Sequence, residues 1–149
     1  MTLLLENYVV PERGQVEIVF QRSFEIKVTA EEARREVNRW LIEFVSIQMG
    51  ADEPALVIGD RVVWRVPAHI SFPQVGYAGN VGTIDINVET GEMDATEDKA
   101  AEMKRHGQEI AKRLPPFKPI SVPSEFLPKD VPPAKRLIVT DDGQLRPAE

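Results

Sequence analysis

Two histidines, His69 and His106, are the imidazole groups of this chain, and no cysteine accompanies them. The lack of cysteine excludes disulfides, thiolate catalysis and thiolate metal sites. His69 and Ser71 share one face of a predicted strand, but serine-type hydrolysis also needs an orienting acid and an oxyanion hole. No sequence pattern indicates either, so we interpret both histidines as hydrogen-bonded surface residues and expect no catalytic residue.

Three polar residues, Asp85, Asn87 and Glu89, alternate along another predicted strand and point to one face. A calcium loop that began at Asp85 would need Gly at its sixth position and Glu at its twelfth, and both positions hold Thr. We therefore predict a solvated strand face, no metal site and no cofactor. An enzyme that uses Asp85, Glu89 or His69 stays as the third functional hypothesis.

Three glycines, Gly76, Gly79 and Gly82, fall in the predicted loop 73–80 and just after it. A loop that cradles phosphate ends at a helix N-terminus, whereas this one runs into a strand. We predict a flexible crossing loop instead, with Gln74 and Tyr77 as candidate contacts for a protein partner because exposed aromatic residues often dominate interfaces.

The chain that positions these residues is acidic. It has 149 residues and a net charge of −6. That charge argues against nonspecific binding to nucleic acid or to anionic membranes. The first residues lack the basic stretch of a secretory signal, and no apolar run approaches the roughly 20 residues that cross a bilayer. We expect a cytoplasmic protein.

The central residues predict an α+β core over 29–114. Thr29 and Glu32 form a capping box that begins a helix over 29–49, with Gly50 as its stop. Gly59-Asp60 predicts a tight hairpin between a strand at 55–58 and one at 61–72, in which Pro67 indicates an edge position or a bulge. The residues of the second strand expected to face inward are Trp64, Val66, Ala68, Ile70 and Phe72.

A third strand at 81–88 ends in a turn that needs positive φ at Gly91, and a second helix follows at 97–114. Gly107 lies inside that helix at a cost of roughly 1 kcal/mol, which indicates a close contact. The predicted fold is an antiparallel sheet of four to five strands with helix 29–49 on one face and helix 97–114 at an edge or end.

Both ends of the chain look extended. Residues 14–29 alternate apolar and polar side chains, which predicts a bent strand or loose hairpin within an N-terminal β arm over 1–28. Residues 115–149 hold eight of the 12 prolines and form a predicted extended strap. Within it, 137–140 predicts one short strand and 141–143 a turn. The strap packs either on its own domain or on a partner, and its contact candidates are Phe117, Phe126 and Leu127.

The segments that carry a family likeness are Val63-Trp64-Arg65-Val66, Gly82-Thr83-Ile84-Asp85-Ile86-Asn87 and Glu89-Thr90-Gly91-Glu92. Together with the preceding helix, residues 37–93 resemble PepSY-like domains, in which an amphipathic helix packs on an antiparallel sheet. The resemblance implies a non-catalytic binding or inhibitory module. The chain also resembles uncharacterised small bacterial regulatory, antitoxin-like proteins through its Trp-Arg-Val-Pro strand and through Glu102-Met103-Lys104.

The leading hypothesis is a binding or regulatory protein that acts through the arm, loop 73–80 and the strap. Its partner is another protein or a second copy, with a homodimer formed through the arm or the strap. The second hypothesis is a small-ligand sensor with a pocket between the long helix and the sheet, beside Trp40 and Trp64. Plain core packing is the alternative interpretation of both tryptophans.

Overall fold

The computed structural model describes residues 1–116, 122–126, 128–130 and 136–147. The chain divides into two units, Met1–Phe117 and Lys118–Glu149. Phe117 and Leu127, two of the predicted partner contacts, lie outside the described residues.

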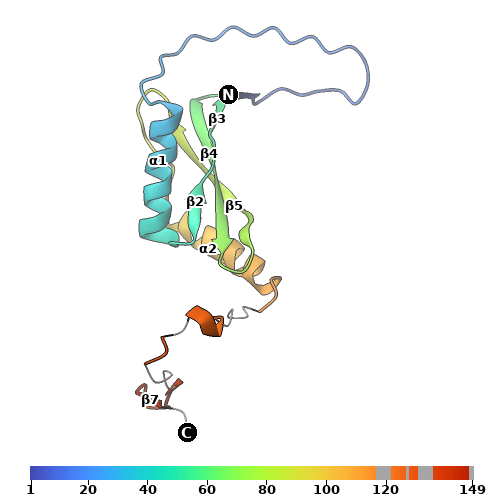
Figure 1. Cartoon of the computed structure of the whole chain (residues 1–149). Helices are drawn as coiled ribbons and strands as arrows, with labels where there is room; N and C mark the ends of the chain where they lie inside the picture. Colours follow the sequence, from blue (N-terminus) through green and yellow to red (C-terminus); the bar gives the residue numbers. More distant parts are fainter. Residues whose placement is uncertain (117–121, 127, 131–135, 148–149) are drawn as a thin grey trace. The chain divides into compact units, whose positions relative to one another are not determined.

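The first unit has the predicted α+β architecture, with two helices and a sheet of five strands (Figure 1). The strands are β1 (Thr2–Leu5), β2 (Met49–Ala51), β3 (Ala55–Ile58), β4 (Val62–Phe72) and β5 (Gly76–Asn87). The helices are α1 (Ala30–Trp40), which a π-helical turn η1 (Leu41–Val45) prolongs, and α2 (Glu97–Lys112).

Strand β4 is the centre of the sheet. One of its edges pairs with β5, and the other pairs first with β3 and then with β2. The Gly59-Asp60 hairpin is confirmed, but an edge position for Pro67 is wrong. Pro67 accepts a hydrogen bond from Asp52 N–H at 2.8 Å, and a strand residue directs its N–H and C=O to the same side. Proline has no N–H, and the donor that Pro67 lacks would have pointed to the connection between β2 and β3. The pairing register of β4 with β5 shifts just after this position, between Ala68 and His69.

The long helix begins as predicted and ends early. The Thr29 hydroxyl accepts from Glu32 N–H at 3.2 Å, and Thr29 N–H donates to the Glu32 carboxylate at 2.9 Å. The helical turns stop at Val45, because Ser46 takes an extended conformation. Gly50 is not a helix stop. It lies in β2 opposite His69, where a Cβ would come within 2.9 Å of the imidazole.

The predicted strand over 14–29 is wrong. The arm contributes β1 instead, which pairs in parallel with β3 and makes the sheet mixed rather than wholly antiparallel. Residues 27 and 28 donate two backbone hydrogen bonds to Val88 C=O and add no ladder. The neighbouring edge of β5 is already occupied, since Asn87 N–H donates to Glu92 and Asp94 N–H donates to Asp85.

The core lies between the helices and one face of the sheet. The alternation predicted for β4 is confirmed, because Trp64, Val66, Ala68 and Ile70 are buried there. Helix α2 packs against β5, and Gly107 makes the predicted close contact: a Cβ would come within 2.9 Å of Ile70 Cδ1. The buried residues that α1, η1 and α2 contribute are Ala33, Val37, Leu41, Ala100, Met103 and Gly107.

The second unit contains a short hairpin. Strands β6 (Leu137–Val139) and β7 (Leu145–Pro147) pair antiparallel, and Gly143 in the turn has a φ of +77°. The strand and turn predicted at 137–143 are therefore confirmed. A single 3₁₀ turn, Ser124–Phe126, precedes the hairpin.

Candidate functional site

His69 lies on the open face of β4 and has the acid partner that sequence reasoning missed. Its Nδ1 is 2.8 Å from Asp52 Oδ1, and its ring stacks on Tyr77 with centroids 4.8 Å apart. Asp52 directly follows β2, and no local pattern links it to a histidine 17 residues away. The pair ties the connection between β2 and β3 to β4, and among the described residues no hydroxyl is hydrogen-bonded to His69.

His106 is also hydrogen-bonded. Its Nδ1 is 2.9 Å from Val81 C=O, which joins α2 to β5. The two histidines thus connect different parts of the fold, and each forms a hydrogen bond, as predicted.

The three polar residues Asp85, Asn87 and Glu89 form different contacts in the structure. Asp85 accepts two hydrogen bonds of 3.0 Å from the Arg65 guanidinium, and Glu6 accepts a third from it at 2.7 Å. The two bonds to Asp85 raise the pKa of Arg65. Asn87 Oδ1 accepts from Glu89 N–H and stabilises the turn. Within the part of the chain that the structure describes, no three acidic or histidine side chains gather as a metal site requires.

Loop 73–80 is shorter than predicted, because β5 begins at Gly76. Gly82 belongs to the strand and not to a flexible loop, and a Cβ there would come within 3.1 Å of the Met103 methyl group. This glycine therefore permits close packing of α2. Gln74 and Tyr77 are both exposed at this end of the hairpin, where Tyr77 covers the His69 ring.

The two tryptophans do not line a common pocket. Trp64 is 1% exposed, and its Nε1 donates to Val28 C=O at 2.7 Å. It is a core residue that also holds the end of the arm. Trp40 is half-buried and lines a hollow between η1 and α2, not a space between the helix and the sheet.

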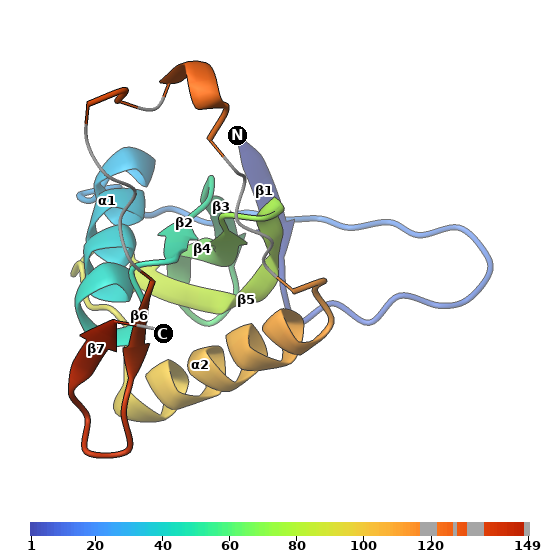
Figure 2. The ribbon, with the colours of Figure 1, turned by 60° about the horizontal axis from the view of Figure 1, so that its bottom comes forward.

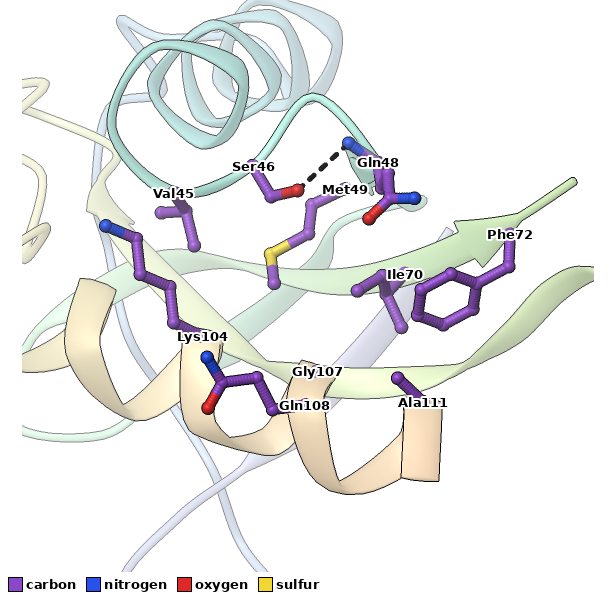
Figure 3. Close-up of a pocket in the computed structure, with 10 residues that line it drawn as sticks. All are labelled: Val45, Ser46, Gln48, Met49, Ile70, Phe72, Lys104, Gly107, Gln108 and Ala111. Atoms are coloured by element: carbon purple, nitrogen blue, oxygen red, sulfur yellow. Dashed lines mark hydrogen bonds between the residues drawn. The ribbon is translucent and has the colours of Figure 1, made fainter. Parts of the chain in front are cut away.

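Two hollows follow the seam between η1 and α2. The first has a volume of about 300 Å³, and its residues are Val45, Ser46, Gln48, Met49, Ile70, Phe72, Lys104, Gly107, Gln108 and Ala111 (Figure 3). The second has a volume of about 530 Å³, and its residues are Trp40, Phe44, Ala95, Thr96, Glu97, Ala100, Ala101 and Lys104. Since Lys104 lines both, we name them together the α2 groove.

One flank of α2 forms one wall of this groove along the whole helix. Its residues recur at intervals of three or four, which places them on the same side of an α-helix. They are Glu97, Ala101, Lys104, Gln108 and Ala111. A helix of 16 residues is about 24 Å long, so the groove is long enough for a short peptide segment.

The opposite wall combines apolar side chains with Ser46 and Gln48 and is open to solvent. Phe44, which lines the second hollow, is 61% exposed. The helix predicted over 29–49 would have continued through Phe44 in regular α-helical turns. The early end of the helix and its last π-helical turn rotate this ring outward. Lys104 projects between the two walls (Figure 3) and, among the described residues, forms no salt bridge.

Comparison with protein-family models, with curated proteins and with solved structures gives no match. The resemblance to PepSY-like and antitoxin-like proteins therefore stays a prediction. Within the described ranges, no helix is both long and apolar enough to cross a membrane.

Proposed function

We propose that this chain is a non-catalytic protein-binding module, and that the α2 groove receives an apolar segment of a partner protein. The observation that supports this proposal is the exposed Phe44 beside a hollow of about 530 Å³. Large exposed apolar side chains that border a concave surface are typical of interaction sites. We propose the cytoplasm as its compartment.

The groove favours a particular kind of segment. Small alanines at 101 and 111 allow a peptide backbone or helix to approach α2 closely. Lys104, between the two hollows, offers one positive charge to an otherwise apolar occupant. We therefore expect a segment with apolar residues on both sides of one aspartate or glutamate.

Selection of linear peptides from a display library against the full chain tests this proposal. We expect the enriched peptides to have apolar residues around an acidic one. The Ala101→Arg variant fills the groove with a long cationic side chain, so the affinity of these peptides should fall at least about tenfold. Fluorescence anisotropy of a labelled peptide measures the change.

Glu109→Arg is the matched control, because it places the same side chain at an exposed position on the outer face of α2. Peptide affinity should be unchanged in this variant. A library that yields no specific peptide, or peptides that bind Ala101→Arg as tightly as the original chain, would contradict the proposal.

A small polar molecule in the first hollow is the second candidate function. The amides of Gln48 and Gln108 and the ammonium of Lys104 border a floor of Met49, Ile70 and Phe72 (Figure 3). A volume near 300 Å³ is at the lower end for small-ligand sites. A thermal-shift screen with small metabolites discriminates the two, since only this candidate predicts a compound that raises Tm.

A further inference from the structure

Within the first unit, a wide loop projects from the sheet after β1 (Figure 1, Figure 2). Both of its ends lie at the β3–β4 hairpin. Glu6 N–H donates to Ile58 C=O at 3.0 Å, and the Arg22 guanidinium donates to Gly59 C=O at 2.9 Å and to Asp60 C=O at 3.1 Å. We name residues 8–21, which project between these contacts, the arm loop.

The arm loop exposes large apolar side chains although its sequence has the alternation of a strand. Val16, Ile18 and Phe20 point to one face by their period of two, and all three are exposed. No backbone hydrogen bond joins residues 15–20 to another described residue. Their amide and carbonyl groups are therefore free to pair with the edge of a sheet.

Strand β1 presents such an edge. It is the terminal strand of its sheet and, in the described part of the chain, pairs only with β3. Leu3 pairs with Leu56, which in turn pairs with the buried Trp64, so Leu3 points to the face of the sheet that carries the helices. It nevertheless stays 52% exposed, which leaves apolar surface uncovered at this edge.

We propose that two copies of this chain form a dimer in which residues 15–20 of each copy add as a strand to β1 of the other. Val16, Ile18 and Phe20 would then cover the exposed Leu3 and Leu5. This self-association is independent of the α2 groove and goes beyond the function proposed above.

A second copy is the occupant that the structure favours because each chain carries one unpaired strand segment and one unpaired strand edge. In a two-fold symmetric dimer, the segment 15–20 of each copy pairs with the β1 edge of the other, so neither the segment nor the edge stays unpaired. The arm loop follows β1 after only two residues, Glu6 and Asn7, so the unpaired segment and the unpaired edge are neighbours in the chain.

Light scattering after size-exclusion chromatography tests the dimer. We expect a mass of twice 16.7 kDa for the full chain. Val16→Asp places a charge in the new interface and should raise the dimer dissociation constant at least about tenfold. Val75→Asp is the control, because Val75 is 44% exposed against 46% for Val16 but lies at the β4–β5 hairpin; it should leave the dimer intact.

Crosslinking supplies a second measurement, since the natural chain has no cysteine. A Leu3→Cys chain is mixed with a size-tagged Ile18→Cys chain and treated with a short bismaleimide. We expect a mixed crosslinked dimer, and none when Val75→Cys replaces Ile18→Cys. A monomer at high concentration, a Val16→Asp chain that dimerises normally, or a Leu3→Cys/Ile18→Cys chain that crosslinks only within itself would overturn the proposal.

Discussion

Gly107 shows how a single missing Cβ sets the distance between a helix and the sheet. A Cβ there would lie 2.9 Å from Ile70 Cδ1 and 3.2 Å from Met49 Cε. Glycine costs a helix roughly 1 kcal/mol relative to alanine, and the close packing of α2 offsets that cost. The same contact borders the α2 groove, because Gly107 lines the first hollow.

Gly107→Val should lower the free energy of unfolding by about 1–3 kcal/mol, since its methyl groups overpack the space occupied by Ile70. Urea denaturation measures the change. Glu109→Val introduces the same β-branched side chain on the exposed face of α2 and should cost only the difference in helix propensity. Valine has a higher helix propensity than glycine, so a loss of stability at position 107 reports overpacking. A Gly107→Val variant as stable as the original chain would contradict the close contact.

At the scale of elements, α1 depends on a well-formed start because its end is irregular. The capping box at Thr29 and Glu32 satisfies two backbone N–H donors at the first turn, those of Thr29 and Glu32. Glu31 lies in the same turn, and its hydrogen bond from Arg34 lowers the pKa of its carboxyl group. The other end leaves the helical conformation at Ser46, whose N–H donates to Leu41 C=O.

Thr29→Ala should lower the free energy of unfolding by about 1 kcal/mol, because it leaves Glu32 N–H without its acceptor. Thr29→Ser keeps the hydroxyl and should restore most of that stability. Thermal or urea unfolding followed by circular dichroism measures both variants. A serine variant as unstable as the alanine variant would mean that the threonine methyl group, and not the cap, is responsible.

At the scale of the molecule, the first unit holds the core that the structure describes. Both tryptophans and every buried hydrophobic residue named above belong to Met1–Phe117. The described apolar residues of the second unit, among them Phe126 and Leu137, are exposed. A chain without residues 118–149 therefore keeps all of that described core.

Removal of residues 118–149 should leave Tm within about 2 °C of the full chain. The near-ultraviolet circular dichroism of Trp40 and Trp64 should also be unchanged, because it reports on the packing of the first unit. A decrease in Tm of more than about 5 °C, or loss of the tryptophan signal, would show that the second unit stabilises the first.

The amino-acid sequence by itself determined the features whose causes are local. The capping box at Thr29, the Gly59-Asp60 hairpin and the alternation of β4 depend on neighbours a few residues apart, and all three are present in the structure. Helix α2 begins and ends within two residues of its prediction, because acidic residues at its start and two prolines after its end define it.

The tertiary structure decided which segments find partners. Residues 15–20 have the alternation of a strand and stay unpaired, whereas Thr2–Leu5 pairs with β3, more than 50 residues along the chain. The Asp52–His69 pair and the α2 groove also join residues that are distant in sequence. Alternation indicates only that a segment can pair. Which edge is free to receive it depends on the geometry of the assembled sheet.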